Sequence, residues 1–531
     1  MKPFLMGLET EYAVSGHNGC GPMPAEELYA LLNHAVRQDH LWLSDAAGGE
    51  GIYLENGGRL YMDAGAHPEY ASPECFDPAQ LAAHDKAGER ILESARRRVQ
   101  SEHPELQLAI VKNNIGPVFP DRYTWGCHEA FTCWIPLGRA APQIVPHLVS
   151  RIIYAGAGCL SAHPGTAGFE LSQRARHLVR VTGEETTSNR AIFCTRIRKA
   201  NDLSSSGWVR AHLIGKDSQR SPFGTYLAFG TTGLLFLIMN ENRKVGKGLK
   251  LAQPVQALQA ISRDPWLRVR VPLADGRRLT ALEIQESYLA ECERAVQKGG
   301  FPPWTSEVIR HWRETLADLA KDPLRLANRL DAYIKLLIHD HELRRAGYTW
   351  SDLRQALNTL ATLRERYPEE LIRVLLAEDP KPLQAEMQAQ YAVAIKQAGP
   401  RRHGRLDRLR FAVRLQALDL NYHELGGIFD KLAKAGQVQS VVLHASDVER
   451  ATREPPPGGR AALRGDGIKT HRQGGWVCDW RYLYHAASRK FVDLRDPFET
   501  VPRTATIEEL PDHDLEEFDV LESLLARVQR R

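Results

Sequence analysis

The sequence predicts an α+β protein with a sheet-rich first part, a helical middle part and a small mixed segment at the end. The chain has 531 residues, of which 43% are hydrophobic, so it can bury a large core and is expected to form two or three domains. Residues 1 to about 240 contain short apolar or alternating runs between turn residues, which is typical of strands mixed with helices. From Leu279 onward apolar residues recur every three or four positions, which is the period of α-helices.

Strands are expected in the first part wherever an apolar or alternating run lies between turn residues. They fall within the strings KPFLMGLET, GGRLYMDAG, LQLAIVKNN, HEAFTCWIP and AIFCTR. Residues 79–100 have helical periodicity and few breakers, so a helix is expected there. The longest apolar run, Phe229–Met239, is too short to span a membrane and is expected to lie in the core.

Helices are expected through the middle part, where apolar residues keep a helical spacing. The expected segments are 279–297, 305–319, 323–346, 351–366 and 381–398. Two polar, breaker-rich stretches, Gly399–Arg405 and Arg453–Gly459, mark joints. After the second joint the sequence predicts a strand pair, within WVCDWRYLYH and KFVDLRD, and then an acidic tail helix.

Composition excludes several classes of protein. The net charge of +4 is a weak bias, and basic residues are interleaved with acidic ones, so nucleic acid is not an expected partner, whereas an acidic protein partner is compatible. The eight cysteines form no CxxC pair, which disfavours a structural zinc site or a disulfide framework and favours a reducing cytoplasm. The first residues, MKPFLMGLETEY, contain no long apolar stretch, so neither a secretory signal nor a membrane partner is expected.

The first candidate site lies in the string GLETEYAV. If this segment is a strand, Glu9 and Glu11 project to the same face, because side chains alternate with a period of two. Two neighbouring carboxylates repel each other, and a bound cation between them removes that repulsion. Hard oxygen ligands of this kind suit magnesium. The alternative is a solvent-exposed polar strand face.

The second candidate site lies in the string GGRLYMDAGAHPEYASPEC. On a strand Tyr61 and Asp63 share a face, and the turn that follows presents His67 and Glu69. Two carboxylates and a histidine within seven residues can supply metal ligands and a general base. The alternative is a turn that carries solvated charges.

Two further groups contain histidines and arginines. In WGCHEAF, His128 and Glu129 are adjacent, so on a strand they point to opposite faces and at most one of them joins the site. Arg196, Arg210 and His212 lie near apolar, strand-like runs, where arginines can clamp phosphates. The alternative for these arginines is an ion pair with a carboxylate at the edge of the core.

The common phosphate-binding motifs are absent. The chain contains no GxxxxGK[ST] loop, no GxGxxG after a strand, no HExxH and no kinase signature set. An ATP-using enzyme with this sequence would therefore hold the phosphates through metal ions and side chains.

Taken together, these motifs resemble one family, the Pup ligases and their sister enzymes, the Pup deamidases or depupylases. The resemblance rests on strings that run in the family's order from residue 5 to about 500. They are GLETEYAV, NGGRLYMDAGAHPEYASPEC, DKAGERILE, KNN, GCHE, LSQRARH, CTR, PVQALQAISRDP, LDLNYHE, GIFDKL, PPPGGRAALRG and DPFETV. Only the stretch of roughly residues 345–415 has no counterpart in this pattern.

The resemblance implies a glutamine-synthetase-like fold. A curved antiparallel sheet with packed helices, which holds ATP and magnesium, is expected over residues 1–440, and a small C-terminal α/β domain over residues 441–531. Residues 351–415 are expected to form a helical insertion outside the catalytic core.

The resemblance also implies roles for individual residues. Those that match metal-site positions are Glu9, Glu11, Tyr61, Glu69 and His128. Asp63 matches the catalytic aspartate. Those that match phosphate- or nucleotide-contacting positions are Arg196, Arg210 and Trp480.

Two reactions are compatible with this family. A ligase uses ATP to phosphorylate the side-chain carboxylate of the glutamate that ends a small Pup-like protein modifier, and a lysine of a protein substrate then attacks. A deamidase or isopeptidase hydrolyses an amide, such as that of a modifier ending in Gln, while nucleotide stays bound.

The sequence contains signals for both reactions. The residues of the strings PVQALQAISRDP and ASPECFDP are more similar to the deamidase branch. Only Ser44–Gly51 stands where that branch has a long loop, and a short loop leaves the site open to the lysine of a folded protein, so ligation is expected and hydrolysis is the alternative. A modifier-binding adaptor with weak or no turnover is a third hypothesis, disfavoured because Glu9, Glu11, Asp63 and Glu69 are all intact.

Overall fold

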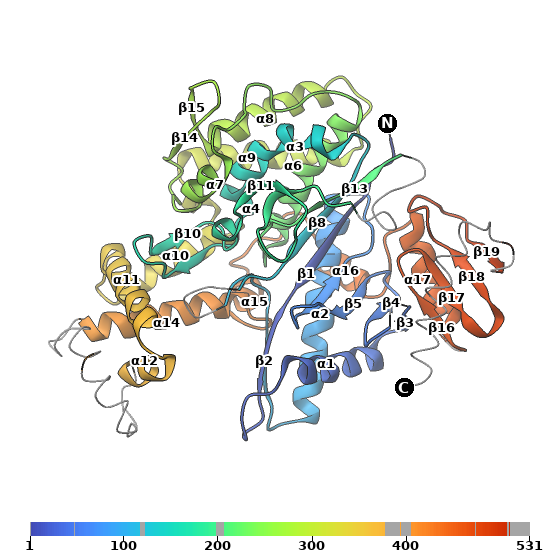
Figure 1. Cartoon of the computed structure of the whole chain (residues 1–531), viewed down its shortest axis with the longest axis horizontal. Coiled ribbons are helices and arrows are strands. Elements are labelled where there is room, and N and C mark those ends of the chain that lie inside the picture. The colour runs from blue at the N-terminus through green and yellow to red at the C-terminus, as the bar shows by residue number, and fades with distance from the viewer. Residues whose placement is uncertain are drawn as a thin grey trace.

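The computed structural model describes residues 2–46, 48–116, 123–197, 207–376, 393, 405–472, 474–506 and 509. An 11-stranded mixed sheet runs through it, from the centre to the C-terminal strands at the right of Figure 1. In sheet order its strands are β13 (Val209–Leu213), β8 (Cys127–Cys133), β1 (Met6–Glu11), β6 (Pro68–Ala71), β5 (Arg59–Met62), β4 (Ile52–Leu54), β3 (Trp42–Asp45), β16 (Trp476–Cys478), β17 (Tyr482–His485), β18 (Lys490–Asp493) and β19 (Arg503–Thr506). The large sheet and the many helices confirm the α+β class.

Smaller strand pairs lie beside the main sheet. They are β2 (Ala13–His17) with β7 (Gln107–Val111), β9 (Cys159–Ser161) with β10 (Gly168–Glu170), β11 (Arg180–Gly183) with β12 (Ala191–Cys194), and β14 (Arg270–Pro272) with β15 (Arg278–Thr280). All five strings that predict strands contain one in the structure, namely β1, β5, β7, β8 and β12.

Strand β1 separates the core from the polar face of the sheet. Met6 and Leu8 are buried in the main hydrophobic cluster, together with residues of α2 (Pro78–Glu102) and α6 (Pro222–Asn240). Glu9 and Glu11 alternate with them and therefore face the other side, as the period of two predicts. Antiparallel pairing sets Glu9 opposite His128 of β8 and Glu11 opposite Glu69 of β6.

Helix α6 forms the centre of the core. It contains the apolar run Phe229–Met239, and all 19 of its residues are buried. By length and composition alone it could cross a membrane, but the whole helix is enclosed by the rest of the protein, which confirms the expected core position. Ser221 caps its first turn by accepting a hydrogen bond from the amide of Gly224 at 3.3 Å.

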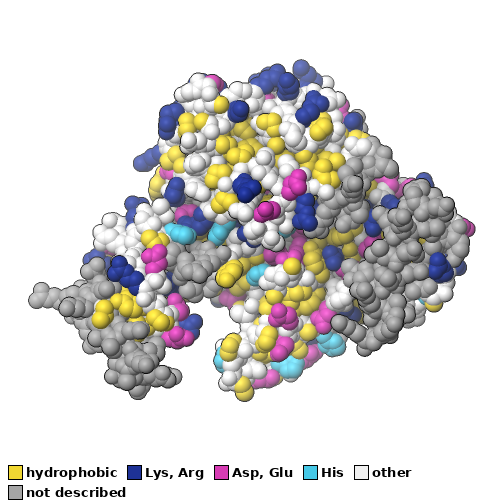
Figure 2. Space-filling view, viewed as in Figure 1, with side chains coloured by type: hydrophobic (Ala, Val, Ile, Leu, Met, Phe, Trp, Pro, Cys, Tyr) yellow, Lys and Arg dark blue, Asp and Glu magenta, His cyan; other side chains and the backbone are white. Residues whose placement is uncertain are grey.

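The other helices lie around the sheet, and most of them build the upper and left parts of the molecule, whereas the first lies in its lower centre and the last at its right (Figure 1). They are α1 (Ala25–Asp39), α3 (Leu137–Ser150), α4 (Ile152–Ala155), α7 (Pro254–Ser262), α8 (Ala281–Val296), α9 (Trp304–Lys321), α10 (Asp331–Arg345), α11 (Trp350–Arg366), α12 (Glu369–Leu376), α14 (Arg405–His423), α15 (Ile428–Lys434), α16 (Ala445–Ala451) and α17 (Gly459–His471). Three 3-10 turns are η1 (Ala175–His177), η2 (Pro323–Leu326) and η3 (Ala486–Ser488). On the face drawn in Figure 2, Lys and Arg side chains are numerous over the upper helices and mixed with Asp and Glu elsewhere.

One expected helix is two elements. Residues 323–346 divide into η2 and α10, with an extended residue, Leu330, before α10. The break has a structural reason, because the side chain of Asp331 accepts hydrogen bonds from the backbone amides of Arg220 and Ser221 and so fixes the start of α10 against the start of α6. Segments 279–297, 305–319 and 351–366 are helical as expected, whereas 381–398 and the acidic tail helix lie outside the described residues, apart from residues 393 and 509.

The described helices of residues 351–415 belong to the hydrophobic core, whereas their position outside the catalytic core stays a prediction. Helices α11 and α14 place buried side chains in the main hydrophobic cluster, among them Leu357, Leu360 and Phe411. Beyond this segment, Asp419 near the end of the same helix α14 lies 3.0 Å from the ammonium of Lys335 in α10. Helical spacing was therefore the signal of a core element, and deleting the whole segment would open the core.

The C-terminal strands continue the sheet of the first part. Strand β16 pairs with β3 in parallel, and Val477 and Cys478 stand opposite Ser44 and Asp45. The expected strand pair near the C-terminus is present and belongs to the four strands β16 to β19. Backbone hydrogen bonds between β3 and β16 thus join the segments before and after residue 440. The domain boundary near residue 440 stays a prediction.

Candidate active site

A cavity of about 380 Å³ lies on the polar face of the sheet, between β1, β5, β6, β8 and β13 on one side and the C-terminal segment on the other. The predicted site residues that line it are Glu9, Tyr61, Asp63, Glu69, His128, Arg210 and Trp480. Glu11 adjoins it through its contacts with Asp63 and Glu69. Arg196 does not line the cavity, but its Nη1 donates a 3.4 Å hydrogen bond to the hydroxyl of Thr186, which does.

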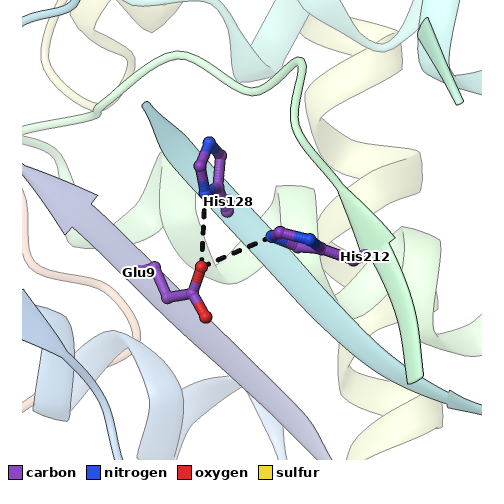
Figure 3. A group of neighbouring side chains, drawn as sticks. All are labelled: Glu9, His128 and His212. Atoms are coloured by element: carbon purple, nitrogen blue, oxygen red, sulfur yellow. Dashed lines mark hydrogen bonds and ion pairs between the residues drawn. The ribbon is translucent and has the colours of Figure 1, made fainter. Parts of the chain in front are cut away.

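Glu9 is the centre of the first cluster. Its Oε2 lies 3.2 Å from Nδ1 of His128 and 3.4 Å from Nε2 of His212, as Figure 3 shows, and its Oε1 accepts a hydrogen bond from Arg210 at 3.1 Å. Burial opposes ionisation of Glu9, but the hydrogen bonds from the two histidines and the charge of Arg210 outweigh it and hold its pKa well below the usual range. Glu9 is therefore an anion in this cluster.

His212, for which the sequence predicted no role, lies in the site. Burial and the charge of Arg210 lower its pKa to about 4, so its imidazole is neutral near pH 7 and can donate a lone pair to a metal. Arg210 and His212 are two residues apart on β13, so the period of two that paired Glu9 with Glu11 also places these side chains on one face. That signal was present in the sequence.

The second cluster contains only carboxylates. Glu11, Asp63 and Glu69 each offer an oxygen, and these atoms lie within 4.8 Å of one another. Burial and the charges of Glu9 and Glu11 raise the pKa of Glu69 well above its usual range. Such a carboxylate is stabilised in its ionised form by a cation, so the donor set fits a hard divalent ion.

Tyr61 lies between the clusters, opposite Glu69 in the pairing of β5 with β6. Its hydroxyl hydrogen-bonds Glu69, and burial together with the charges of Glu69 and Glu9 raises its pKa well above the usual range. A phenol that keeps its proton is a better hydrogen-bond donor than a metal ligand.

Gly126 explains how the two clusters come so close. A Cβ at this position would lie 2.3 Å from Oε1 of Glu11 and 2.4 Å from Nε2 of His128. The glycine therefore leaves the space in which both side chains meet. The sequence gives no sign of this role, because the close approach depends on the pairing of distant strands.

Asp63 stands at the end of β5, half-buried at the mouth of the cavity. Its Oδ2 accepts a hydrogen bond from the amide of Gly65 at 3.1 Å, which leaves its other oxygen available. His67, which the sequence offered as a further ligand, stacks on Trp125 at 4.8 Å and lies 3.2 Å from the carbonyl of Tyr12. It holds the loop in place and belongs to neither cluster.

His128 and Glu129 confirm the prediction that only one of the pair joins the site. Glu129 is fully buried on the core face, where Nη1 of Arg151 donates to it at 2.8 Å.

The opposite end of the cavity is built by an acid and two arginines. Glu74 accepts hydrogen bonds from Arg460 and Arg464 of α17 and therefore connects the two sides of the cavity. Burial opposes its ionisation, but the two guanidinium charges lower its pKa to about 2. Trp480 lies over Arg464, with the guanidinium carbon 4.6 Å from the ring centroid. Glu74 and Arg460 were part of matching strings, but no role was predicted for them.

Comparisons with known proteins give one consistent result. The model of the family described as Pup-ligase protein matches residues 4–369 and 401–484, so it leaves out a shorter stretch than the expected insertion. A Pup–protein ligase of Acidimicrobium ferrooxidans is 32% identical over 460 residues, 84% of this chain and 86% of that protein. A Pup deamidase/depupylase of Mycolicibacterium smegmatis is 38% identical over 311 residues, 58% of this chain and 61% of that protein.

Solved structures of the Pup ligase PafA share the fold. The complex of PafA with Pup has a TM-score of 0.71 and 22% identity and covers 99% of this chain and 94% of that chain. The complex of PafA with ADP has a TM-score of 0.65 and 21% identity, with 95% and 94% covered.

Proposed function

Since the chain belongs to the Pup ligase family, we propose that it is an ATP- and magnesium-dependent ligase that joins a small Pup-like modifier to lysines of other proteins. The observation that carries this proposal is the pair of clusters around Glu9 and Glu69, which concentrates carboxylates at one end of a cavity. A site for polyphosphate that lacks a phosphate-binding loop needs cations of this kind.

The clusters divide the work of holding cations. The oxygen donors of Glu11 and Glu69 suit magnesium, with Asp63 beside them left for another role, and the mixed set of Glu9, His128 and His212 suits magnesium or manganese. Bound there, the ions offset the charge that develops during phosphoryl transfer. Tyr61 orients Glu69 by its hydrogen bond, so we assign it to positioning of a ligand.

The nucleotide is proposed to lie along the cavity, with its base towards Trp480 and its phosphates over Glu9. Trp480 offers a ring face beside Arg464, whereas Arg210 lies where phosphate oxygens would meet it. We keep Arg196 as a phosphate-contacting residue in the proposal, because it hydrogen-bonds Thr186, which lines the cavity. The PafA structure with ADP supports nucleotide as the ligand of this cavity.

The proposed reaction has two steps. The side-chain carboxylate of the modifier's terminal Glu takes the γ-phosphoryl group, which gives an acyl phosphate and ADP. A lysine amine then forms the new amide bond, phosphate leaves, and the amine's proton passes to a base. Asp63 fits that base, because it is half-buried at the mouth and accepts only one hydrogen bond within the described chain.

The direction of the reaction rests on access to the site. Strands β3 and β4 are joined by a tight connection, in which the amide of Asp45 donates to the carbonyl of Gly51 at 3.0 Å. No long loop stands at this place, which supports admission of a folded protein's lysine. Hydrolysis is the second candidate, and the 38% identity to a depupylase favours it. Intact clusters speak against an adaptor without turnover.

Stoichiometry tests the proposal. Incubation with Pup ending in Glu, a lysine-bearing protein and ATP should give a covalent adduct and one ADP per bond. Cleavage of the amide of Pup ending in Gln, without net ADP release, would replace the ligase by the hydrolase. Binding of Pup with neither reaction would support the adaptor.

A further inference from the structure

Arg174 is a buried cation without a partner. Its side chain is fully enclosed, and within the described chain none of its three guanidinium nitrogens has a hydrogen-bond partner. Burial, followed by the charge of Arg190, lowers its pKa to about 10, so it is still charged near pH 7. A buried charge without a partner is costly and is retained where something compensates for it.

The other buried arginines of the described chain are all paired with acids. Arg151 binds Glu129, Arg220 binds Glu89 and Asp430, and Arg464 binds Glu74. Arg174 is thus the exception among arginines in the same kind of environment. Among the described residues no acid is paired with its guanidinium, so the site is open to an anion from another molecule.

The position of Arg174 indicates which anion this is. Glu11 is the first acid whose charge acts on Arg174, and it also acts on Arg190. Backbone hydrogen bonds join Glu11, at the end of β1, to Gly126, and join Trp125 to Asn114, whose amide donates to the side chain of Gln173. Met6, at the start of β1, bridges to Cys75, and the preceding Glu74 binds the Arg464 that lies against Trp480. Arg174 follows Gln173 and is therefore placed towards the Glu11 end of β1, away from Trp480.

Arg190 adds a second cation at this end. It donates to the carbonyls of Thr124 at 3.0 Å and Thr186 at 3.1 Å. Thr124 is followed by Trp125, whose indole N–H is buried without a hydrogen-bond partner in the described chain, and then by Gly126, which contacts Glu11. The indole N–H of Trp125 and the guanidinium of Arg174 are thus free donors that suit an oxyanion, beside one free acceptor, the Oδ1 of Asn113, within the described chain.

The backbone holds Arg174 rigidly. The carboxylate of Asp217 accepts from the amide of Arg174 at 3.1 Å and from that of Gln173 at 3.0 Å. The side chain of Gln173 in turn accepts from the amide of Asn114 at 2.8 Å. The strings LSQRARH and KNN, which the proposed function leaves without a role, thus form the support of this one guanidinium.

We infer that Arg174 binds the α-carboxylate of the modifier's C-terminal residue, with Arg190 as a second positive charge beside it. This inference rests on the proposed function. The side-chain group of that residue reacts, whereas its α-carboxylate is unchanged and always present, so a fixed cation beyond the reacting centre selects the end of the chain. This carboxylate-binding site, which we call the Arg174 site, accepts a terminal Glu and a terminal Gln equally. The inference is therefore independent of whether the enzyme ligates or hydrolyses.

The test compares Arg174→Met with Arg180→Met, a matched loss of charge at an exposed residue of β11. Binding of two forms of Pup is measured by calorimetry, one with a free terminal α-carboxylate and one with an α-carboxamide. Wild type and Arg180→Met should bind the acid at least about 30-fold more tightly than the amide, the scale of a desolvated charge pair. Arg174→Met should bind both forms equally weakly and keep the wild-type affinity for ADP with magnesium.

Thermal unfolding distinguishes a ligand-binding role of Arg174 from a structural role. Without ligands, Arg174→Met should unfold at the wild-type temperature or above it, because an unpaired buried charge is removed. A lower unfolding temperature, or unchanged preference for the acid form, would overturn the inference. The inference would also be overturned if inorganic phosphate raised the unfolding temperature of wild type and Arg180→Met but not of Arg174→Met. That result would assign the Arg174 site to a phosphoryl group. Wild-type protein that binds neither Pup nor ADP would instead refute the proposed function.

Discussion

The two ends of the cavity shift the pKa of a buried glutamate in opposite directions. At the end near Trp480, Glu74 is held by two arginines and its pKa is lowered. At the other end Glu69 faces further acids and its pKa is raised. In the first arrangement the charge of the acid is compensated by arginines, whereas the second cluster, among the described residues, contains only carboxylates, which is where we propose that cations bind. The difference teaches that charge compensation, more than the number of acids, separates a structural site from a binding site.

The largest effect is expected from breaking the compensated end. Glu74→Gln should lower the free energy of unfolding near pH 7 by about 3 kcal/mol, since a carboxyl whose pKa falls from 4.5 to about 2 is stabilised by that order. This stability is present above pH 4.5 and is lost as the pH falls through about 2. Urea unfolding of both proteins at pH 7 and pH 3 measures it, and a pH-independent difference would contradict the ion-pair explanation.

Next in size is the effect of Asp63→Asn. Turnover should fall by about two orders of magnitude or more, which is typical for the loss of a general base. Folding should be kept, because the amide is nearly the same size and can still accept from Gly65. Single-turnover assays measure the rate, and calorimetry with ADP and magnesium should show near wild-type affinity. Near-full activity would remove Asp63 from the base role.

A third variant closes the space between the clusters. In Gly126→Ala the new Cβ displaces Glu11 and His128, whose free ends can move, so the fold should persist while magnesium-dependent nucleotide affinity falls about tenfold. Gly116→Ala is the matched control, because a Cβ there meets open space. Equal affinities for the two variants would show that the close approach is dispensable.

The smallest effect is expected at the uncompensated end without metal. Glu69→Gln should raise the free energy of unfolding in EDTA by about 1 kcal/mol, because one of several repelling acids is removed. Added magnesium should stabilise wild type and have little effect on the variant. A loss of stability in EDTA would place Glu69 in the same class as Glu74.

Sequence patterns were sufficient where a side chain's direction depends on its own strand. Alternation alone places Glu9 with Glu11, separates His128 from Glu129, and would have added His212 to Arg210. The resemblance extended this to Asp63 and Trp480. Patterns were insufficient where register between distant strands decides, as with Gly126, or where α17 meets residues far before it, as with Glu74. For the helices of 351–415 the spacing shows an apolar face and does not show that the main hydrophobic cluster covers it.

The parallel pairing of β3 with β16 also has a consequence for biosynthesis. Strand β3 ends at Asp45 and its partner starts at Trp476, about 430 residues later in the chain. At about 5–20 residues per second, tens of seconds pass on the ribosome before that edge can be covered. An uncovered edge offers free N–H and C=O groups to any passing strand. Until the last strands emerge, this edge of a nascent chain is open to pairing with other strands, and a chain truncated before Trp476 keeps it open.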